Sequence, residues 1–398
     1  TMDGNFRFGD FYDGEVYDAT VNLNKVKWRA ADIYKPKFKP QITVRYGCPV
    51  TAHERLTPLS HFPAKNRKEE IYDFGQNFAG VVSLRIKGRK GQKITVRHAE
   101  IITDGDLNVK SLRTAKATLT YTCKEGEQEY SPCLTYMGFR YIGIEGISPE
   151  NIEVSALALY SDFEETGSFE CSDPLLNQLQ SNIRWSGKSN FVDIPTDCPQ
   201  RDERMGWTGD ISVFAKTACF NFDLAAFLEK WLYDVRAEQG HGGGLPLVVP
   251  KQGISAPTVA TACWADCIVL VPWAEYLARG DRELLRTMYP AIKKYLKAVK
   301  FWASLSGPGK YKRHIWKWLF QFGDWCAPEG GIMDWMKRGR EIATAYYANS
   351  CRIVSEIARI LGKSDDAKYY AALSQKIAEA FRHVFTDGKG TLKKEFQT

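Results

Sequence analysis

One short segment of this 398-residue chain gathers most of the side chains that could carry out chemistry. Four carboxylates, two arginines and a tryptophan lie there between a proline and two glycines. Charged side chains avoid burial without partners and Trp favours burial, so this Gly/Pro-punctuated loop predicts a polar pocket with an aromatic wall. Such a pocket suits a sugar, because carboxylates and Arg bind hydroxyls, an aromatic face covers the C–H side of the ring, and a protonated carboxyl can donate to a glycosidic oxygen. The segment reads Asp197-Cys198-Pro199-Gln200-Arg201-Asp202-Glu203-Arg204-Met205-Gly206-Trp207-Thr208-Gly209-Asp210.

The composition sets wide bounds on the class of protein. A length of 398 residues predicts two or three domains, and a hydrophobic content of 44% is ample for globular folding. Eleven Trp and nineteen Tyr mildly favour a carbohydrate-facing surface, although an aromatic-rich core explains them more simply. The net charge is +7, but the lysines are spread over solvated faces and form no basic run interleaved with stacking aromatics. Nucleic acid is therefore not expected as a partner.

The cysteine pattern argues against a metal site. Ten cysteines are present, without a CxxC pair or a zinc-like spacing to His. We expect no metal and no cofactor, while noting that the carboxylates of the 197–210 segment could ligate a divalent cation. No run of residues predicts a transmembrane helix, so no membrane partner is expected, and no signal peptide opens the sequence. Scattered thiols suit a reducing compartment, but they do not decide the location.

The first part of the chain has the pattern of a β-sandwich. From about Ile42 to Leu159, short apolar runs alternate with Gly-rich turns. Arg140 and Tyr141 fall where the last strands would close the sheet, and we expect a structural role for them. The predicted strands cover residues 81–86, 93–97, 118–122, 141–144 and 152–154.

After Ser172-Asp173-Pro174 the pattern becomes helical. Ser172 or Asp173 is the expected N-cap, and Pro174 falls in the first turn. Gly-rich and aromatic loops join helices of moderate length, which is typical of an α/α toroid with an active site at one mouth, although the periodicity itself indicates only many helices. The predicted helices cover residues 174–191, 210–220, 223–239, 259–279, 281–304, 341–361 and 364–385.

The 197–210 segment closely resembles the signature of bacterial α-L-rhamnosidases, inverting glycoside hydrolases built on an (α/α)6 barrel. The resemblance covers nearly the whole chain and implies an antiparallel β-sandwich followed by a partial (α/α)6 toroid of the six-hairpin glycosidase type. It predicts residues 1–39 as the end of a preceding β domain with a linker, 40–165 as the sandwich, and 166–398 as the N-terminal part of the catalytic barrel. Further motifs that carry the resemblance are Gly14-Glu15-Val16-Tyr17-Asp18-Ala19, Asp73-Phe74-Gly75-Gln76-Asn77, Gly138-Phe139-Arg140-Tyr141, Trp264-Ala265-Asp266, Pro272-Trp273 and Gly323-Asp324-Trp325.

The two ends of the sequence also resemble interior parts of the family. The opening residues resemble the last strand of a β domain, and Phe396-Gln397-Thr398 resembles the middle of a motif that opens a helix. Seven helical periods are too few to close a barrel of twelve helices. The expectation is an internal piece of a larger enzyme.

The resemblance assigns roles to seven residues. Glu203 is the expected general acid, and a partly desolvated position beside Trp207 would help it keep its proton. The neighbouring Arg201 and Arg204 oppose this effect, so both are expected to point elsewhere. The family pattern places Arg201, Asp197 and Asp210 on sugar hydroxyls, and places Trp207, Trp264 and Trp325 as aromatic walls around a 6-deoxy sugar.

Some assignments in this region have two interpretations. Core packing explains Trp264 and Trp325 as well as a pocket wall does. Asp266 and Asp324 are pocket residues or helix caps, with capping the safer expectation. Ala265 stands where the family usually has Gly.

No general base is assigned in this sequence. Inversion requires a second carboxylate about 6.5–9.5 Å from the acid. The resemblance places that Glu beyond Thr398, and no motif marks Glu329, Glu341 or Glu395 as a substitute.

The expected function is the release of terminal α-L-rhamnose from glycosides or oligosaccharides with inversion. The alternatives are a non-catalytic carbohydrate-binding or scaffold module, and a related (α/α)6 glycosidase with another sugar specificity. A Ser/His/Asp hydrolase is disfavoured, because no G-x-S-x-G motif accompanies the six histidines. The sequence does not decide the aglycone or the oligomeric state, and a homodimer is among the states it allows. The family slightly favours a periplasmic or secreted enzyme, and a cytoplasmic one stays open.

Overall fold

A computed structural model describes residues 4–39, 42, 44, 46–252, 260–317 and 321–393. The chain divides into two compact units, the first comprising Thr1–Asp162 with Ser168–Arg204 and the second Phe163–Gly167 with Met205–Thr398. The domain boundaries expected after residues 39 and 165 stay predictions. Among the described helices, none has the length and apolarity needed to cross a membrane.

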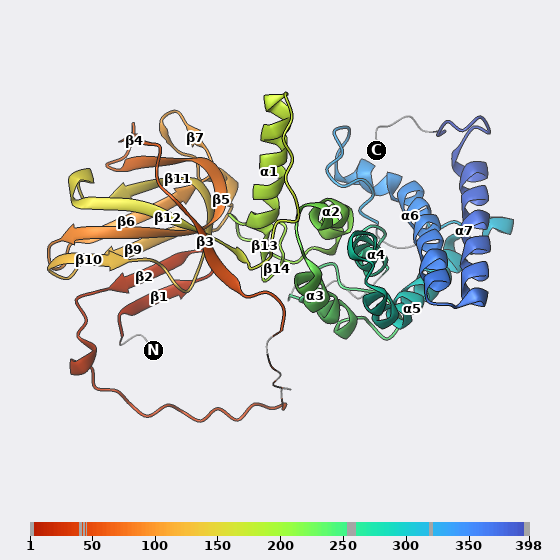
Figure 1. Ribbon diagram of the computed structural model, residues 1–398, viewed down its shortest axis with the longest axis horizontal. Helices are drawn as coiled ribbons and strands as arrows, with labels where there is room; N and C mark the ends of the chain where they lie inside the picture. Colours follow the sequence, from red (N-terminus) through yellow and green to blue (C-terminus); the bar gives the residue numbers. More distant parts are fainter. Residues whose placement is uncertain are drawn as a thin grey trace. The chain divides into compact units, whose positions relative to one another are not determined.

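The first unit is organised around one long strand, β5 (Glu70–Gly88), which takes part in two sets of pairings (Figure 1). Its first half pairs with β4 and β11, and its second half pairs with β10 and β12. The order along the sheet is β1-β2-β9-β6-β11-β5-β12-β3. All pairs of described strands are antiparallel except β2 with β9, so the predicted antiparallel sandwich is confirmed with one parallel exception. The other strands are β1 (Phe6–Asp10), β2 (Gly14–Asp18), β3 (Val50–Leu56), β4 (Ser60–Pro63), β6 (Lys93–Ala99), β7 (Ile102–Thr103), β8 (Asp106–Leu107), β9 (Thr118–Thr122), β10 (Gly126–Tyr130), β11 (Met137–Glu145) and β12 (Ile152–Ser161).

Alternation of apolar and polar residues builds the core of this sandwich. Phe78 of β5 and Phe139 of β11 are fully buried and pack with their ring centroids 4.6 Å apart. On β11, Arg140 donates two hydrogen bonds to Asp73 of β5, at 2.8 and 2.9 Å. This paired geometry ties two central strands together, in line with the structural role expected for Arg140.

Helix α1 (Pro174–Asn190) completes the first unit. Of the two predicted caps, Asp173 is the N-cap, and its side chain accepts a hydrogen bond from the Leu175 backbone N–H at 2.8 Å. The helix packs against β5 and β12. At its end, Ser189 accepts a hydrogen bond from the Ala79 N–H at 3.2 Å. The chain then forms a small hairpin of β13 (Phe191–Val192) and β14 (Ile194–Pro195) and enters the 197–204 loop.

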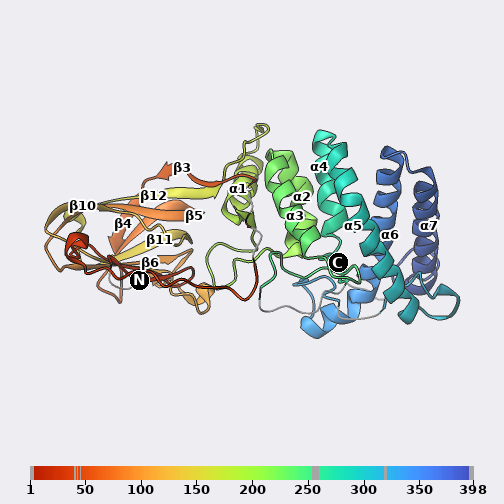
Figure 2. The same cartoon turned by 90° about the horizontal axis from the view of Figure 1, so that it is seen from below.

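The second unit consists of helices that stand side by side (Figure 2). Helix α2 packs on α4 and α4 on α6, while α3 packs on α5. Two predicted helix starts were wrong. Helix α4 begins at 267 rather than 259, because residues 262–266 form turns with Cys263 at φ +68°. Helix α6 begins at 332 rather than 341. Residue 259 itself lies outside the described residues. The helices are α2 (Thr208–Asn221), α3 (Ala225–Ala237), α4 (Cys267–Arg279), α5 (Arg282–Ser306), α6 (Ile332–Ile360) and α7 (Ser364–Phe385).

Candidate active site

Arg204 anchors the 197–204 loop to the sandwich of the first unit. Its side chain is only 5% exposed, and its guanidinium donates to the carbonyl oxygens of Phe11 at 3.0 Å and Tyr136 at 2.6 Å. The same group lies over the rings of Phe11, Tyr12 and Tyr136, between 5.1 and 5.5 Å from their centroids. Burial lowers the pKa of Arg204 from its ordinary value. As predicted, Arg204 points away from Glu203.

Gly138 of β11 allows the loop to lie close to the sheet. A Cβ atom at this position would come within 2.8 Å of the carbonyl carbon of Pro199 and 2.7 Å of its ring. Any side chain at this position would push the loop outward. The close packing of the loop on β11 therefore explains why a glycine opens the Gly138-Phe139-Arg140-Tyr141 motif.

Glu203 lies in this loop with 18% of its side chain exposed and holds two arginines through one oxygen. Its Oε2 accepts from Arg201 Nε at 3.0 Å and from Arg113 Nη1 at 2.8 Å. The prediction that Arg201 points elsewhere was therefore wrong, because a two-residue separation in a tight loop brings the guanidinium back to the carboxylate. Arg201 also donates from Nη2 to Asp197 Oδ2 at 3.2 Å. No described residue donates a hydrogen bond to Oε1 of Glu203.

Three residues of the sandwich hold the Asp202-Glu203 pair, and sequence reasoning missed all of them. Besides the Arg113 contact, Thr114 Oγ1 donates to Asp202 Oδ2, and the Tyr12 hydroxyl donates to the Glu203 carbonyl at 2.8 Å. The Thr114 hydrogen bonds are the main cause that lowers the pKa of Asp202. No local pattern marks these residues, because they lie 88 to 191 positions away from their partners in the chain.

The loop also brings together three potential metal ligands, Asp197, Cys198 and Glu203, whose atoms lie within 4.8 Å of one another. The set fits a cation poorly. Arg201 already donates a hydrogen bond to each of the two carboxylates, and burial raises the pKa of the Cys198 thiol to about 12, so a thiolate ligand is disfavoured.

A separate pocket of about 460 Å³ lies within the second unit. It opens where α2 begins, where the turns before α4 end and where α6 passes, so loop and helix residues share its wall. The structure brings Asp210, Trp264 and Trp325 together there, whereas Trp207 is not among the lining residues. Burial raises the pKa of the Cys263 thiol to about 12, so a neutral thiol faces the pocket. The lining residues are Gly209, Asp210, Val213, Cys263, Trp264, Gly323, Asp324, Trp325, Ile342, Ala345 and Tyr346.

The two tryptophans of this pocket differ in burial. Trp264 is 9% exposed and packs against Phe322 with the two rings tilted by 34° and their centroids 4.3 Å apart, while Trp325 is 41% exposed. Gly209 lies directly under Trp264, since a Cβ atom at 209 would come within 2.6 to 2.8 Å of the indole ring. Trp264 therefore packs in the interior and also lines the pocket, whereas Trp325 forms an exposed aromatic wall of the pocket. The indole N–H of Trp264 is buried and has no hydrogen-bond partner among the described residues.

The expectation that Asp266 and Asp324 cap helices was wrong. Asp266 occupies the N-cap position of α4, but its side chain makes no capping bond. Its carboxylate instead accepts from the Cys263 N–H at 2.8 Å and the Ser350 hydroxyl at 2.6 Å, and burial raises its pKa. Asp324 precedes no helix directly and lines the pocket.

The residues considered as substitute bases do not line this pocket. Glu341 borders another hollow, with Lys317 and Arg340, and Glu329 is exposed. Glu395 lies outside the described residues. No general base is therefore assigned among the residues that the structure describes.

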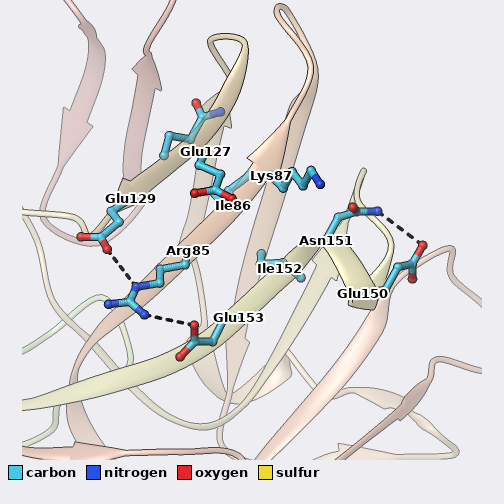
Figure 3. A pocket seen from close by; sticks show the side chains of 10 residues that line it. Arg85, Ile86, Lys87, Glu127, Glu129, Glu150, Asn151, Ile152 and Glu153 are labelled. Carbon is cyan, nitrogen blue, oxygen red and sulfur yellow. Dashed lines mark hydrogen bonds and ion pairs between the residues drawn. The ribbon is translucent and has the colours of Figure 1, made fainter.

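A third hollow, of about 480 Å³, lies on the exposed face of the sandwich (Figure 3). It runs over β5, β10 and β12 and contains four glutamates around Arg85 and Lys87. Arg85 forms ion pairs with Glu129 at 2.8 Å and Glu153 at 3.4 Å. All three side chains are about 70% exposed, at 69 to 73%, so this is a solvated surface.

Comparison with known proteins agrees with this architecture. Residues 164–398 match the six-hairpin glycosidase domain of bacterial α-L-rhamnosidases, and residues 64–160 match their concanavalin-like domain. The chain belongs to the bacterial α-L-rhamnosidase family. The α-L-rhamnosidases of Formosa agariphila and Streptomyces avermitilis are each 35% identical to it, over 97% and 98% of this chain. The chain spans 42% and 37% of the length of these two relatives.

Solved structures of the family share the fold. The native α-L-rhamnosidase of Aspergillus terreus superposes with a TM-score of 0.87 at 34% identity, over 98% of this chain and 46% of that one. The Streptomyces avermitilis α-L-rhamnosidase complexed with L-rhamnose superposes with a TM-score of 0.85 at 33% identity, over 98% and 37%. The predicted succession of a β domain and a partial six-hairpin helical domain is confirmed.

Proposed function

We propose that this chain contributes the acid-bearing part of an inverting α-L-rhamnosidase, with Glu203 as the general acid. The observation that carries the proposal is the asymmetric environment of the Glu203 carboxyl group. Both arginine hydrogen bonds end on Oε2, and no described residue donates to Oε1. Oε1 is therefore the oxygen that can hold a transferable proton.

In the proposed reaction, Glu203 donates the proton on Oε1 to the glycosidic oxygen as the bond between that oxygen and the anomeric carbon breaks. The aglycone leaves as a neutral alcohol. A water molecule attacks the opposite face of the anomeric carbon, and a base outside the described residues takes its proton. The products are a free sugar of inverted configuration and the aglycone alcohol, and no cofactor is required.

Arg201 can serve both the acid and the sugar. Its Nε and Nη2 atoms hold Glu203 and Asp197, while Nη1 forms no hydrogen bond with the described residues. A guanidinium presents its donors in a fixed plane, so Nη1 is oriented once the other two are bound. We assign Nη1 to a sugar hydroxyl, and we keep Asp197 as a further hydroxyl ligand.

The pocket of the second unit supplies the chemistry for holding a 6-deoxy sugar. Trp264 and Trp325 offer aromatic faces to C–H groups, and the carboxylate of Asp210 offers an acceptor for hydroxyls. Burying the methyl group of rhamnose against these rings contributes about 1 kcal/mol. Trp207, which follows Glu203 by four residues, is kept as a third aromatic contact by family resemblance. The L-rhamnose complex of the Streptomyces relative supports this sugar as the ligand class.

The proposal is tested by Glu203→Gln in the complete enzyme, with Glu129→Gln as the matched control on the exposed face. Loss of the acid should lower kcat for an alkyl α-L-rhamnoside by at least about 100-fold, the usual contribution of general acid catalysis. Calorimetric titration with L-rhamnose should give nearly the affinity of the unsubstituted enzyme. Normal turnover by E203Q would remove Glu203 from the reaction, and turnover lost together with sugar binding would reassign it to binding.

A further inference from the structure

We infer that Arg113, a residue of the sandwich, is a positioning residue for the proposed acid. Its guanidinium fixes Oε2 of Glu203 so that the proton is carried on Oε1. The β domain would then be part of the catalytic apparatus rather than an accessory. This inference rests on the proposed role of Glu203.

The first support is that neighbouring residues of the sandwich bind neighbouring residues of the loop. Two consecutive sandwich residues, Arg113 and Thr114, bind two consecutive loop residues. Arg113 Nη1 contacts Glu203 Oε2 at 2.8 Å, and Thr114 contacts Asp202 through both its hydroxyl and its backbone N–H, the latter at 3.4 Å. With the Tyr12 hydroxyl on the Glu203 carbonyl, the acid is held at its backbone, at its side chain and at the preceding residue. Such multiple restraint fixes a side chain better than one ion pair does.

The second support is backbone strain at Arg113. The residue follows a short 3-10 turn, Lys110–Leu112, and has φ +57° and ψ −112°. Side chains with a Cβ disfavour this region, which glycine would occupy without cost. Strain of this kind persists where surrounding contacts determine the conformation, and it is concentrated at functional sites. Here the strained residue is one of the two arginines whose side chains bind Glu203.

The third support is the electrostatic setting. The Glu203 side chain is 18% exposed and the Arg113 side chain 54%. An isolated pair with this exposure would contribute little. Two guanidiniums, of Arg113 and Arg201, nevertheless converge on the same oxygen atom, Oε2. When Oε1 releases its proton, negative charge develops on the carboxyl group, and donors already in place on Oε2 stabilise that charge.

A positioning role predicts a dependence on the leaving group. A poor leaving group needs its proton in the transition state, whereas an activated one such as 4-nitrophenolate departs with little help. Removing Arg113 should therefore slow the hydrolysis of alkyl rhamnosides much more than that of 4-nitrophenyl rhamnoside. Sugar binding should stay unchanged, because Arg113 acts through Glu203.

The test compares Arg113→Met and Arg113→Lys in the complete enzyme, with Arg85→Met as a control that also removes an arginine holding glutamates. For R113M, kcat on an alkyl rhamnoside should fall about tenfold to 100-fold, with KM and the L-rhamnose affinity within about twofold. Added guanidinium ion at concentrations that do not unfold the enzyme should restore part of kcat in R113M and none in E203Q. R113K should retain an intermediate rate. R85M should behave as the unsubstituted enzyme does.

Equal losses on both substrates, a change in KM alone, or an unchanged rate would overturn the inference. If R113M does not fold, R113K and its leaving-group dependence decide the matter alone. The two proposals fail in different ways. Normal turnover by E203Q refutes both, whereas an inactive E203Q with an R113M of normal leaving-group dependence refutes the Arg113 role only.

Discussion

Two clusters of arginine and glutamate lie in the same β-containing unit, and they differ in what surrounds them. On the sandwich face, Arg85 pairs with Glu129 and Glu153, and all three side chains are about 70% exposed (Figure 3). In the 197–204 loop, Glu203 pairs with two arginines and is 18% exposed. The residue types and the pair distances are alike. Only the second cluster has a backbone and a partner set that restrict where the carboxyl group can point.

This difference shows that neither the types of residue present nor the volume of a pocket is enough to define a functional site. The groove beside Arg85 and the aromatic pocket of the second unit have almost the same volume, about 480 and 460 Å³. The groove is lined by long, exposed charged side chains, which keep their hydration and their rotamer freedom. The pocket is lined by tryptophans and a close-packed glycine. A candidate site is therefore marked by side chains that tertiary contacts hold in place.

The largest effect on stability is expected at the anchored arginine. Replacing Arg204 by Met removes a buried guanidinium that donates to the carbonyl oxygens of Phe11 and Tyr136, which then keep only the Thr135 hydroxyl as a donor. The first unit should lose about 3 kcal/mol of stability. Arg85→Met, which removes an exposed guanidinium, should change stability by less than about 0.5 kcal/mol. Urea unfolding followed by circular dichroism measures both changes in stability. Equal losses in the two variants would contradict the claim that the buried arginine contributes more to stability than the exposed one.

A pH effect is expected at His98, which lies beside the same anchor. The imidazole is fully buried and its Nε2 has no partner among the described residues, so burial, with a smaller contribution from the Arg204 charge, lowers its pKa to about 4. Below about pH 6.5 the unfolded chain binds this proton while the folded protein does not. Stability should therefore fall as the pH drops from about 6.5 to about 4, by no more than about 3 kcal/mol.

The variant His98→Gln isolates this contribution. It removes the titrating group while keeping an amide that can donate to the Ala117 carbonyl, which lies 2.8 Å from Nδ1 of His98. The difference in unfolding free energy between the two proteins should change with pH across this interval. A constant difference would mean that His98 titrates alike in the folded and unfolded states.

The smallest effect is expected in the aromatic pocket. Gly209→Ala places a methyl group within 2.6 to 2.8 Å of the Trp264 ring, so the ring must move. Affinity for L-rhamnose should fall about tenfold, which corresponds to about 1.4 kcal/mol. Gly242→Ala is the matched control, because nothing lies within 4 Å of its added Cβ. If calorimetry finds the same affinity for L-rhamnose in G209A as in the unsubstituted enzyme, Trp264 does not take part in sugar binding.

Much of this arrangement could be predicted from the sequence, where local patterns determine the outcome. The β pattern of 42–159, the Asp173 cap and the succession of helices follow from periodicity and turn chemistry, and the structure has them. The starts of α4 and α6 were misplaced, since a left-handed Cys263 and a helix running past Gly339 leave no clear mark in a single sequence. The motif at 197–210 identified the loop and the family.

The partners of Glu203 could not be predicted in the same way. Arg113 and Tyr12 meet the loop through tertiary contacts across 90 and 191 positions, and neither belongs to a motif. The orientation of Arg201 depends on loop geometry that residue types do not specify. Asp324 resembled a cap because Asp favours caps, but no helix begins directly after it. Long-range contacts thus account for what sequence reasoning missed.

The most direct test of the central claim is the leaving-group dependence of E203Q. Hydrolysis rates of a series of aryl α-L-rhamnosides, plotted against the acidity of the departing phenol, compare the variant with the unsubstituted enzyme. The account predicts a steep dependence in E203Q, with losses above about 100-fold for poor leaving groups and small losses for activated ones. Parallel lines for the two proteins would contradict it, because Glu203 would then give no proton to the leaving group.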